Sequence, residues 1–319
     1  MAKLIVCGSV NMDLSIQVDR MPQAGETLAG SNFMTTPGGK GANQAVAASR
    51  LGAPVTFIGA VGDDAFGREL RGTLEADSID TRHLAQSSLP TGTAMILRCN
   101  AENRIILNQG DNGGFDSAYV CEALEQLAEP GDMALTQFEC APQTVRSFIC
   151  SGNELGLYMM VNPAPAAPMD DELLSCCDLL CLNETECEIV CGILPTSLED
   201  CEAAAAKLHE AGVRQVVITL GERGAYGSTG ASDDWLLSPT SHPSALLELS
   251  AQLVEAIPVE AVDTTAAGDT FLGALAAARL EGMSFFDALV FATRASAVTV
   301  TRLGAQVSIP YREELDSLL

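Results

Sequence analysis

Short apolar runs alternate along this chain with longer segments in which apolar residues recur every three to four positions. The runs are mostly continuous, as is typical of strands buried on both faces of a sheet, and the longer segments have the spacing of amphipathic helices. This alternation predicts a mostly parallel sheet flanked by helices. We expect strands at Leu4–Cys7, Val55–Ala60, Met133–Thr136, Leu157–Val161, Leu179–Leu182 and Val216–Leu220, and helices at about 41–51, 65–76, 117–128, 142–152, 198–211, 268–281 and 285–301.

Some segments near the N-terminus follow a different pattern. Leu14–Val18 alternates strictly between apolar and polar residues, and Thr93–Leu107 does so more loosely. Such alternation indicates strands with only one buried face. Together with Thr27–Thr35, these segments predict a small separate sheet inserted among the first strand–helix units. A sheet of this kind placed over a cleft would act as a lid.

The region from Ser228 to Pro258 is the least regular part of the chain. Ser228–Asp234 has the composition of a loop, whereas Ser244–Ala256 has helical spacing. We therefore expect a loop followed by a helix in this region.

The composition favours a cytoplasmic α/β protein. Of the 319 residues, 47% are apolar, which is enough for one large core. No apolar run reaches the ~18 residues of a membrane helix, and Leu4–Cys7 is too short for a secretory signal. The net charge of −25 argues against nucleic-acid binding, which requires clustered Lys and Arg. A bound phosphate would need local compensation by a helix N-terminus, a Lys or a divalent metal.

The eleven cysteines suggest a metal site, but their spacing does not support one. Five lie between positions 176 and 191, yet no two form a Cys-x-x-Cys pair and none of the three histidines lies among them. Structural zinc sites commonly use such pairs. We expect buried or half-buried thiols in a reducing compartment.

Two loops of glycine or small residues lead directly into predicted helices. Pro37–Gln44 contains three glycines that let the backbone approach a ligand, and Lys40 and Asn43 would face that ligand. In Asp263–Phe271, the first helical turn would expose N–H groups as an anion hole, and Asp269 could take a proton from an attacking hydroxyl. The structural alternatives are an ordinary glycine turn for the first loop and a helix-capping acid for the second.

Polar residues also follow three predicted strands, where open α/β sheets bind ligands. Thr219–Gly224 is a glycine-containing loop, and Asn183–Glu186 could hold a hydrated Mg²⁺ beside phosphates. Asn11 and Asp13 could bind vicinal hydroxyls. Each motif also fits an ordinary polar turn or a capped helix start. The chain has neither a Walker A sequence nor a Gly-x-Gly-x-x-Gly loop after the first strand, which disfavours P-loop enzymes and dinucleotide-dependent dehydrogenases.

The order of these motifs resembles the ribokinase family of carbohydrate kinases, the PfkB-type kinases, from about Lys3 to the C-terminus. The most telling segments are Gly38–Ala47, Asn162–Ala166, Asn183–Glu186, Thr219–Gly224, Asp263–Phe271 and Gly304–Gln306. The resemblance implies one α/β domain over residues 1–319, built as a three-layer sandwich with a mostly parallel central sheet. It also implies a small β-sheet lid, drawn from about 12–36 and 92–108, through which a homodimer forms.

The resemblance further implies transfer of the γ-phosphate of ATP to the primary hydroxyl of D-ribose, with Asp269 as base. The remaining roles fall into four groups. The anion hole would comprise Ala266, Ala267 and Gly268. The sugar would be held by Asn11, Asp13, Gly39, Lys40, Asn43, Glu139 and Asp269. The nucleotide would contact Asn183, Thr219, Gly221, Glu222, Gly224, Gly268 and Thr293. Glu186 would organise Mg²⁺ indirectly, and Asp263, Thr265, Thr299, Arg302, Gly304 and Ser308 would bind a monovalent cation, with K⁺ as activator.

Two alternatives stay open. The first is a sibling kinase for deoxyribose, fructose or a nucleoside; Lys40 favours a sugar, because nucleoside kinases of the family usually carry Asp there. The second is a catalytically silent sugar-binding protein, against which the intact Asp269 argues. The chain departs from the family pattern in its long Ser228–Pro258 stretch and at Thr293, where a histidine is common.

Overall fold

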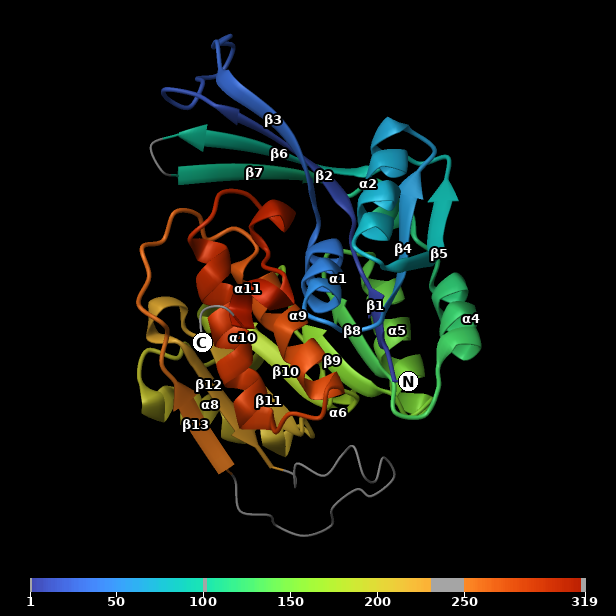
Figure 1. Ribbon diagram of the computed structural model, residues 1–319, viewed down its shortest axis with the longest axis vertical. Helices are drawn as coiled ribbons and strands as arrows, with labels where there is room; N and C mark the ends of the chain where they lie inside the picture. Colours follow the sequence, from blue (N-terminus) through green and yellow to red (C-terminus); the bar gives the residue numbers. More distant parts are fainter. Residues whose placement is uncertain (1, 100–101, 231–249, 317–319) are drawn as a thin grey trace.

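Two β-sheets organise the chain in a computed structural model that describes residues 2–99, 102–230 and 250–316 (Figure 1). Among these residues, the larger sheet has nine strands in the order β13-β12-β11-β10-β9-β8-β1-β4-β5, and the smaller has four in the order β3-β2-β6-β7. From β11 to β5 all neighbouring strands of the larger sheet are parallel, whereas β12 and β13 are antiparallel additions at one edge. The larger sheet comprises β1 (Leu4–Cys7), β4 (Val55–Gly62), β5 (Asp80–Ser87), β8 (Met133–Gln137), β9 (Tyr158–Asn162), β10 (Leu179–Asn183), β11 (Gln215–Thr219), β12 (Ala225–Thr229) and β13 (Ser250–Val254). The smaller comprises β2 (Asn11–Gln17), β3 (Ser31–Gly38), β6 (Gly92–Cys99) and β7 (Glu102–Asn108).

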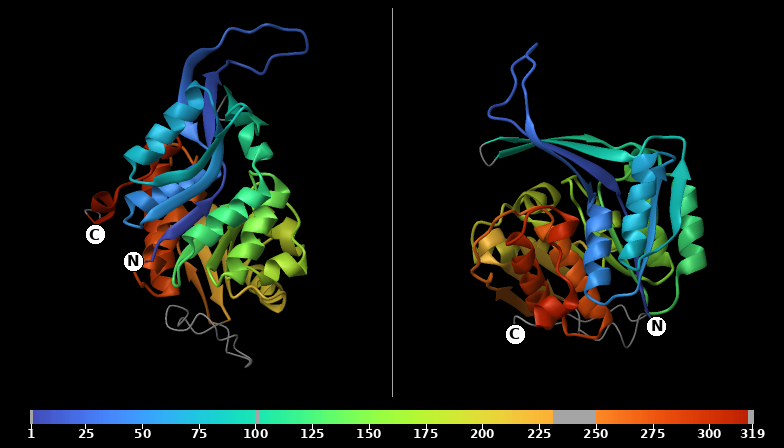
Figure 2. Two further views of the ribbon diagram at one scale, coloured as in Figure 1. Left: turned by 90° about the vertical axis from the view of Figure 1, so that its right-hand side faces the viewer. Right: turned by 45° about the horizontal axis from the view of Figure 1, so that its top comes forward.

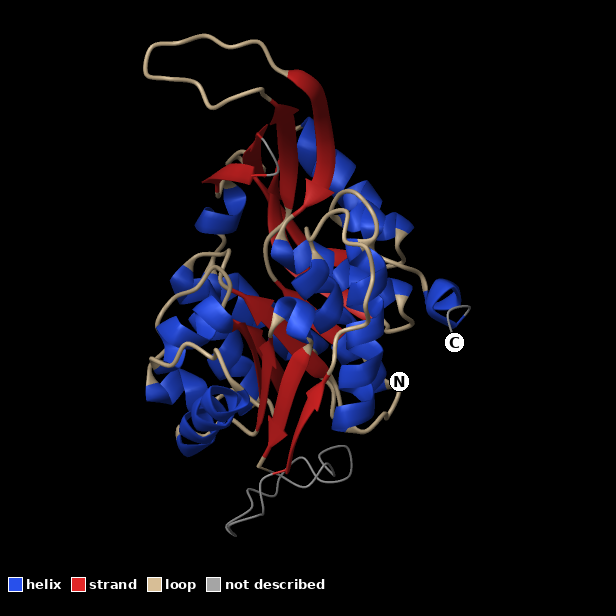
Figure 3. Ribbon diagram, turned by 90° about the vertical axis from the view of Figure 1, so that its left-hand side faces the viewer, coloured by secondary structure: helices blue, strands red, loops and turns tan. Residues whose placement is uncertain are grey.

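Helices cover both faces of the larger sheet, which runs between them in Figure 3. One buried core, which includes Phe57 and Phe285, lies under α1 (Lys40–Arg50), α2 (Ala65–Ala76), α9 (Ala267–Leu280) and α10 (Phe285–Val300). The other, around Phe148, lies under α4 (Ser117–Leu127), α5 (Pro142–Glu154), α6 (Asp171–Ser175), α7 (Glu184–Cys191) and α8 (Leu198–Glu210). Short helices α3 (Asp111–Gly114) and α11 (Arg312–Asp316) and 3₁₀ turns at Gly221–Arg223 and Gln306–Ser308 complete the described elements. None of the described helices has both the length and the apolar character needed to cross a membrane.

The hydrophobic pattern located six strands of the larger sheet and seven long helices to within two residues, and these predictions are confirmed. It did not locate β5 or the buried β12. The predicted helix over Ser244–Ala256 is wrong where the structure describes it, because Ser250–Val254 forms β13. This segment pairs along its whole length with β12, and only Val254 of its side chains is buried. Backbone pairing at a sheet edge therefore overrides the helical spacing. Residues 244–249 lie outside the described part of the chain, and Ser228 and Thr229, predicted as loop, belong to β12.

The predicted small sheet is confirmed, although β3 begins at Ser31 rather than near Thr27. Strands β2 and β3 are inserted between β1 and α1, and β6 and β7 between β5 and α3. The small sheet stands away from the main body, and the loop from β2 to β3 projects furthest (Figure 2). Its strands expose large apolar side chains, among them Phe33 (63% exposed) and Ile106 (64%).

Candidate active site

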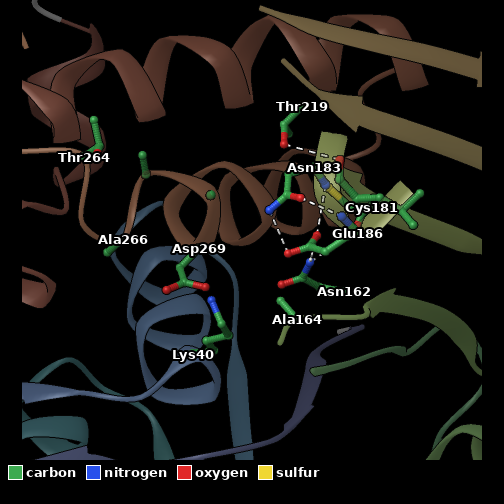
Figure 4. A pocket seen from close by; sticks show the side chains of 13 residues that line it. Lys40, Asn162, Ala164, Cys181, Asn183, Glu186, Thr219, Thr264, Ala266 and Asp269 are labelled. Atoms are coloured by element: carbon green, nitrogen blue, oxygen red, sulfur yellow. Dashed lines mark hydrogen bonds between the residues drawn. The ribbon is translucent and has the colours of Figure 1, made fainter. Parts of the chain in front are cut away.

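A pocket of about 220 Å³ opens where the carboxyl ends of β9, β10 and β11 meet the N-terminus of α9 (Figure 4). Parallel strands direct their C-terminal loops to one edge, which is where open α/β sheets bind ligands. The lining residues are Lys40, Asn162, Ala164, Cys181, Leu182, Asn183, Glu186, Thr219, Thr264, Ala266, Ala267, Gly268 and Asp269. The pocket therefore joins residues from motifs that are more than 200 positions apart.

The Asp269 carboxylate is held by two amides from α1. Asn43 Nδ2 donates to Oδ2 at 2.9 Å, and Gln44 Nε2 donates to Oδ1 at 3.0 Å. The helices α1 and α9 approach closely because Gly273 has no side chain; a Cβ there would lie 2.5 Å from Cβ of Ala47. No side-chain cap hydrogen bond is present at the start of α9. Asp269 therefore makes no capping hydrogen bond, although it lies in the first turn of α9, where the helix dipole favours a negative charge.

The turn before α9 offers fewer free N–H groups than the sequence predicts. Ala266 has a left-handed conformation (φ 60°), and the Ala267 N–H donates to the Thr264 carbonyl at 3.2 Å. Ala267 is therefore engaged in a turn. Within the described residues, the N–H groups of Gly268 and Asp269 have no acceptor, and a Cβ on Gly268 would meet nothing within 4 Å. These two groups are available to an anion at the helix N-terminus.

Lys40 points toward Asp269 from the opposite helix (Figure 4). The preceding Gly39 has φ 91°, and a Cβ there would lie 2.8 Å from the Ser9 carbonyl oxygen, so a side chain does not fit. The Lys40 N–H donates to Glu139 Oε2 at 3.0 Å, and the Ser9 hydroxyl donates to the same oxygen at 2.6 Å. The Asp269 charge raises the pKa of Lys40, against the opposing effect of burial. Lys40 is therefore held as an ammonium group beside this acid.

Asn11 is oriented by Asn112 of α3. Asn112 Nδ2 donates to Asn11 Oδ1 at 2.8 Å and to the Val10 carbonyl at 3.1 Å, and its Oδ1 accepts the Val10 N–H at 3.0 Å. A Cβ on Gly92, at the base of β6, would lie 2.2 Å from Asn11 Oδ1. With its oxygen already paired, Asn11 has its NH₂ group left to donate to a ligand.

Asp13 shares the same region with two other acids. Burial raises the pKa of Asp13 to about 7, and the negative charges of Glu139 and Asp269 add to the shift. Three carboxylates and one ammonium group, that of Lys40, therefore surround the space beside the pocket. Such a cluster suits a ligand that donates several hydrogen bonds.

Asp13→Asn is expected to stabilise the protein at pH 8. The unfolded carboxyl loses its proton near pH ~3.9, whereas the folded one keeps it up to about pH 7. Stability therefore falls as pH rises through this window, because the folded state binds the extra proton. The Asn side chain stays neutral, so the variant does not lose stability as pH rises. Urea unfolding should show a gain at pH 8 that disappears at pH 4.

Asp19→Asn is the matched control, since Asp19 is an exposed acid just beyond the same strand. It removes the same charge without relieving burial, so no pH-dependent gain is expected. An equal gain in both variants would assign the effect to net charge rather than to the buried position of Asp13.

Asn183 and Glu186 form a capping box at the start of α7. Glu186 Oε1 accepts from Asn183 Nδ2 at 2.8 Å, and Glu186 Oε2 accepts from the backbone N–H of Asn183 at 2.9 Å. In return, the backbone N–H of Glu186 donates to Asn183 Oδ1 at 2.9 Å. Asn162 Nδ2 also donates to Glu186 Oε2, at 3.3 Å. Burial raises the pKa of Glu186, while the hydrogen bond from Asn183 and the charge of Lys40 oppose the rise. Oxygen ligands beside this pocket fit a hydrated Mg²⁺.

Four residues expected to contact a nucleotide lie outside the pocket lining. The loop that carries Gly221, Glu222 and Gly224 forms a tight 3₁₀ turn closed by Gly224 N–H to the Gly221 carbonyl. Thr293 lies within α10, where its hydroxyl donates to the Leu289 carbonyl at 2.9 Å. Of this group, Asn183, Thr219 and Gly268 do line the pocket.

The residues proposed for a monovalent cation come from two adjacent segments. Asp263 Oδ1 accepts from the Thr265 N–H (2.9 Å) and Oδ2 from the Gly304 N–H (3.0 Å), so the segments around 263 and 304 touch. Burial acts to raise the pKa of Asp263, but hydrogen bonds from Thr265 and Gly304 outweigh it, and the net shift is downward. An ionised Asp263 fits a cation. Arg302 contributes no free charge, because its guanidinium pairs with Glu314. Thr299 and Ser308 are buried. The Thr299 hydroxyl lies 3.0 Å from the Thr270 hydroxyl of α9 and 3.2 Å from the Ala295 carbonyl, and the Ser308 hydroxyl donates to the Ala305 carbonyl.

Comparison with known proteins decides the family. A family model described as "pfkB family carbohydrate kinase" matches residues 1–312. This chain belongs to the pfkB family of carbohydrate kinases. The kinase is 39% identical to a ribokinase of Schizosaccharomyces pombe over 327 aligned residues, which cover 99% of this chain and 97% of the relative. It is 38% identical to a ribokinase of Haemophilus influenzae over 313 residues, with coverages of 98% and 96%.

A solved structure of Arabidopsis thaliana ribokinase, complexed with ribose and ATP, superimposes on this kinase with a TM-score of 0.85. Its sequence is 29% identical, and the match covers 100% of this chain and 99% of that chain. The α/β architecture with a large, mostly parallel sheet and a separate smaller sheet, as the sequence predicts, is thereby confirmed.

Several polar residues of this pfkB kinase site were not assigned from the sequence. These residues are Gln44, which donates to Asp269, Asn162, which donates to Glu186, and Ser9, which donates to Glu139. Two signals were available: Gln44 follows Asn43 inside the glycine motif, and Asn162 ends a buried strand. Position at a strand's carboxyl end is thus informative even for an amide without obvious chemistry.

Proposed function

We propose that this kinase transfers the γ-phosphate of ATP to the primary hydroxyl of D-ribose. The observation that carries the proposal is a buried Asp269 carboxylate, held by two amides and facing Lys40 at the N-terminus of α9. A base and an anion-binding helix start are adjacent there, as phosphoryl transfer to a hydroxyl requires. Relatives named ribokinase at 38–39% identity, and a neighbour complexed with ribose and ATP, support this substrate pair.

The sugar would bind among the acids and amides next to the pocket. Asn11 donates through its NH₂ group, while Asp13 and Glu139 accept from sugar hydroxyls. Gly39 leaves room for close approach, and Asn43 and Lys40 flank the reacting hydroxyl. Asp269 would then remove the hydroxyl proton as the oxygen attacks the γ-phosphorus and the bond from that phosphorus to the β–γ bridging oxygen breaks, which releases ADP. The free N–H groups of Gly268 and Asp269, with the Ala266–Ala267 turn before them, stabilise the transferring charge.

The nucleotide would lie along β10 and β11. Its phosphates would lie near Asn183, Thr219 and Gly268. Beyond the pocket, the rest of the nucleotide would contact Gly221, Glu222, Gly224 and Thr293. Glu186 and Asn183 would hold Mg²⁺ through water. When bound, Mg²⁺ neutralises phosphate charge, which suits an enzyme with a net charge of −25.

A coupled assay of ADP release tests the substrate. With equal concentrations of ribose, deoxyribose, fructose and adenosine, we expect the highest kcat/KM for ribose. A higher value for deoxyribose, fructose or adenosine would overturn the choice of sugar while leaving the kinase activity intact. Failure of all four to release ADP would overturn the proposed activity.

A monovalent cation bound near Asp263 would stabilise the turn that leads into the anion-binding helix start. We therefore expect K⁺ to activate and Na⁺ to replace it poorly. Rates measured in matched KCl and NaCl buffers check this expectation, with Asp263→Asn as the variant that should lose the difference. Equal rates in the two salts would contradict the cation site.

The small sheet would act as the lid and as the surface of a homodimer. Several of its apolar side chains are exposed, and they lie on both faces of the sheet because neighbours along a strand point to opposite sides; they are Phe33, Met34, Met95, Ile105, Ile106 and Leu107. Sedimentation equilibrium should give twice the mass of 33.3 kDa, and a monomer would contradict the dimer.

All eleven cysteines are free and buried or half-buried, which suits the reducing cytoplasm that we propose as the location of this kinase.

A further inference from the structure

A chain of three side-chain amides runs beneath the pocket. Gln44 lies at its centre and is fully buried. Its Nε2 donates to Asp269 Oδ1 at 3.0 Å and to Asn162 Oδ1 at 3.2 Å. Its Oε1 accepts from Gln137 Nε2 at 2.6 Å. Asn162 Nδ2 in turn donates to Glu186 Oε2 at 3.3 Å, so the amides connect the two acids on opposite sides of the pocket.

The direction of every hydrogen bond in this chain is fixed by groups that can only accept. Asn162 Nδ2 faces the Cys181 carbonyl at 3.0 Å as well as Glu186, so Asn162 Oδ1 must face Gln44. Reversing Gln44 would place its carbonyl against this oxygen and against the Asp269 carboxylate. Gln44 therefore donates to Asp269, and Asn162 donates to Glu186.

Gln137 is the other end of this chain of side-chain amides. It is the last residue of β8 and is fully buried, and its Oε1 has no partner among the described residues. That oxygen fits only because Gly8 has no side chain; a Cβ on Gly8 would lie 2.1 Å from it. A buried carbonyl left unpaired lowers stability, so packing alone would favour an apolar residue at this position. The amide is therefore better explained by the hydrogen bond it donates to Gln44.

We propose that Gln44 is a positioning residue that holds the Asp269 base and, through Asn162, the Glu186 acid in fixed geometry. The inference deepens the proposed function and rests on it. Gln44 touches neither the pocket nor a substrate, because it does not line the cavity. It acts by fixing where the base points and, through Asn162, by keeping an amide donor against Glu186. Partners of this kind typically change activity by ~10–100-fold when they are removed.

Gln44→Met tests the proposal, because Met has nearly the same length and no hydrogen-bonding amide. We expect kcat per folded molecule to fall about 10–100-fold, while the KM values for ribose and ATP change little. The acidic limb of the kcat–pH profile should move to higher pH, since the carboxylate has lost a donor. The Mg²⁺ concentration for half-maximal rate should also rise. Gln44→Glu should move the acidic limb further, because two adjacent carboxylates resist ionisation.

Gln215→Met is the matched control. Gln215 is also buried and accepts from the Tyr158 hydroxyl, but it lies at the opposite end of β11 from the pocket. It should lose stability and keep kcat and the pH profile. If Gln44→Met behaves like this control, the positioning role is overturned. Gln137→Met provides the same test should Gln44→Met not fold, with a smaller fall in kcat expected and an unchanged kcat contradicting the proposal.

Asp269→Asn, assayed alongside, separates the two claims. If Asp269→Asn loses turnover while Gln44→Met keeps normal kcat and pH dependence, only the positioning role of Gln44 would be overturned. Normal turnover in Asp269→Asn would overturn the base itself, and the positioning role of Gln44 with it.

Discussion

Asp269→Asn is expected to lower kcat by about 10²–10⁴-fold, the usual contribution of a positioned general base. The amide cannot accept the proton of the attacking hydroxyl. Sugar affinity should change much less, because the groups proposed to grip the other hydroxyls remain. Steady-state kinetics, with calorimetric titration of ribose, measure the two effects separately. The amide also presents an NH₂ group toward Asn43 or Gln44, both of which donate, so some loss of stability is expected.

Asp287→Asn provides the control for this experiment. Asp287 also lies in the first turn of a helix, α10, where it bonds Ser284 at the surface. If helix-start charge were the source of the Asp269 effect, both variants would lose activity alike. Near-normal turnover in Asp269→Asn would contradict its role as base.

Gly41→Ala is expected to abolish most activity by displacing α1. A Cβ on Gly41 would lie 2.6 Å from the Gly8 and Ser9 backbone, and neither can move independently of β1. Overpacking of this kind costs about 1–3 kcal/mol of unfolding free energy. The helix also carries Lys40 and Asn43, and a displacement of ~1 Å at a reacting centre can cost ~10²-fold in rate. Urea unfolding and kcat/KM measure both effects.

Gly72→Ala is the matched control in a neighbouring helix. Gly72 lies in the interior of α2, is exposed, and has nothing within 4 Å of an added Cβ. Ala should therefore raise stability by about 0.5–1 kcal/mol with unchanged activity. If Gly41→Ala proved as harmless as Gly72→Ala, the close approach of α1 to β1 would not be what the site requires.

Both experiments depend on the same meeting of two helices that are distant in sequence. Helix α1 brings Asn43 and Gln44, and α9 brings Asp269, so neither helix alone forms the site. Gly41 lets α1 approach β1, and Gly273 lets α9 approach α1. The catalytic geometry therefore depends on small residues where the helices pack together. For this reason we expect Gly41→Ala and Asp269→Asn both to cause large losses of activity.

Most of the buried strands, and the long helices, were predictable because solid apolar runs and 3.6-residue periodicity are local properties. β13 was not, because Ser250–Val254 is a strand only through its pairing with β12. The motif loops were predictable as well, since glycine and small residues before a helix are visible in the chain. Within them, the engaged N–H of Ala267 was not visible, because it follows from the left-handed conformation at Ala266.

By itself, the sequence determined the α/β fold, the motif order and the choice of Asp269 as the candidate base, since each depends on residue type and spacing along the chain. Only the tertiary structure decided which partners surround that base. The raised pKa of Asp13 comes from burial and from acids more than 100 positions away. The amide chain from Gln137 to Glu186 joins four separate elements. Hydrogen bonds and charge interactions of this kind depend on distance in space, which no local pattern encodes.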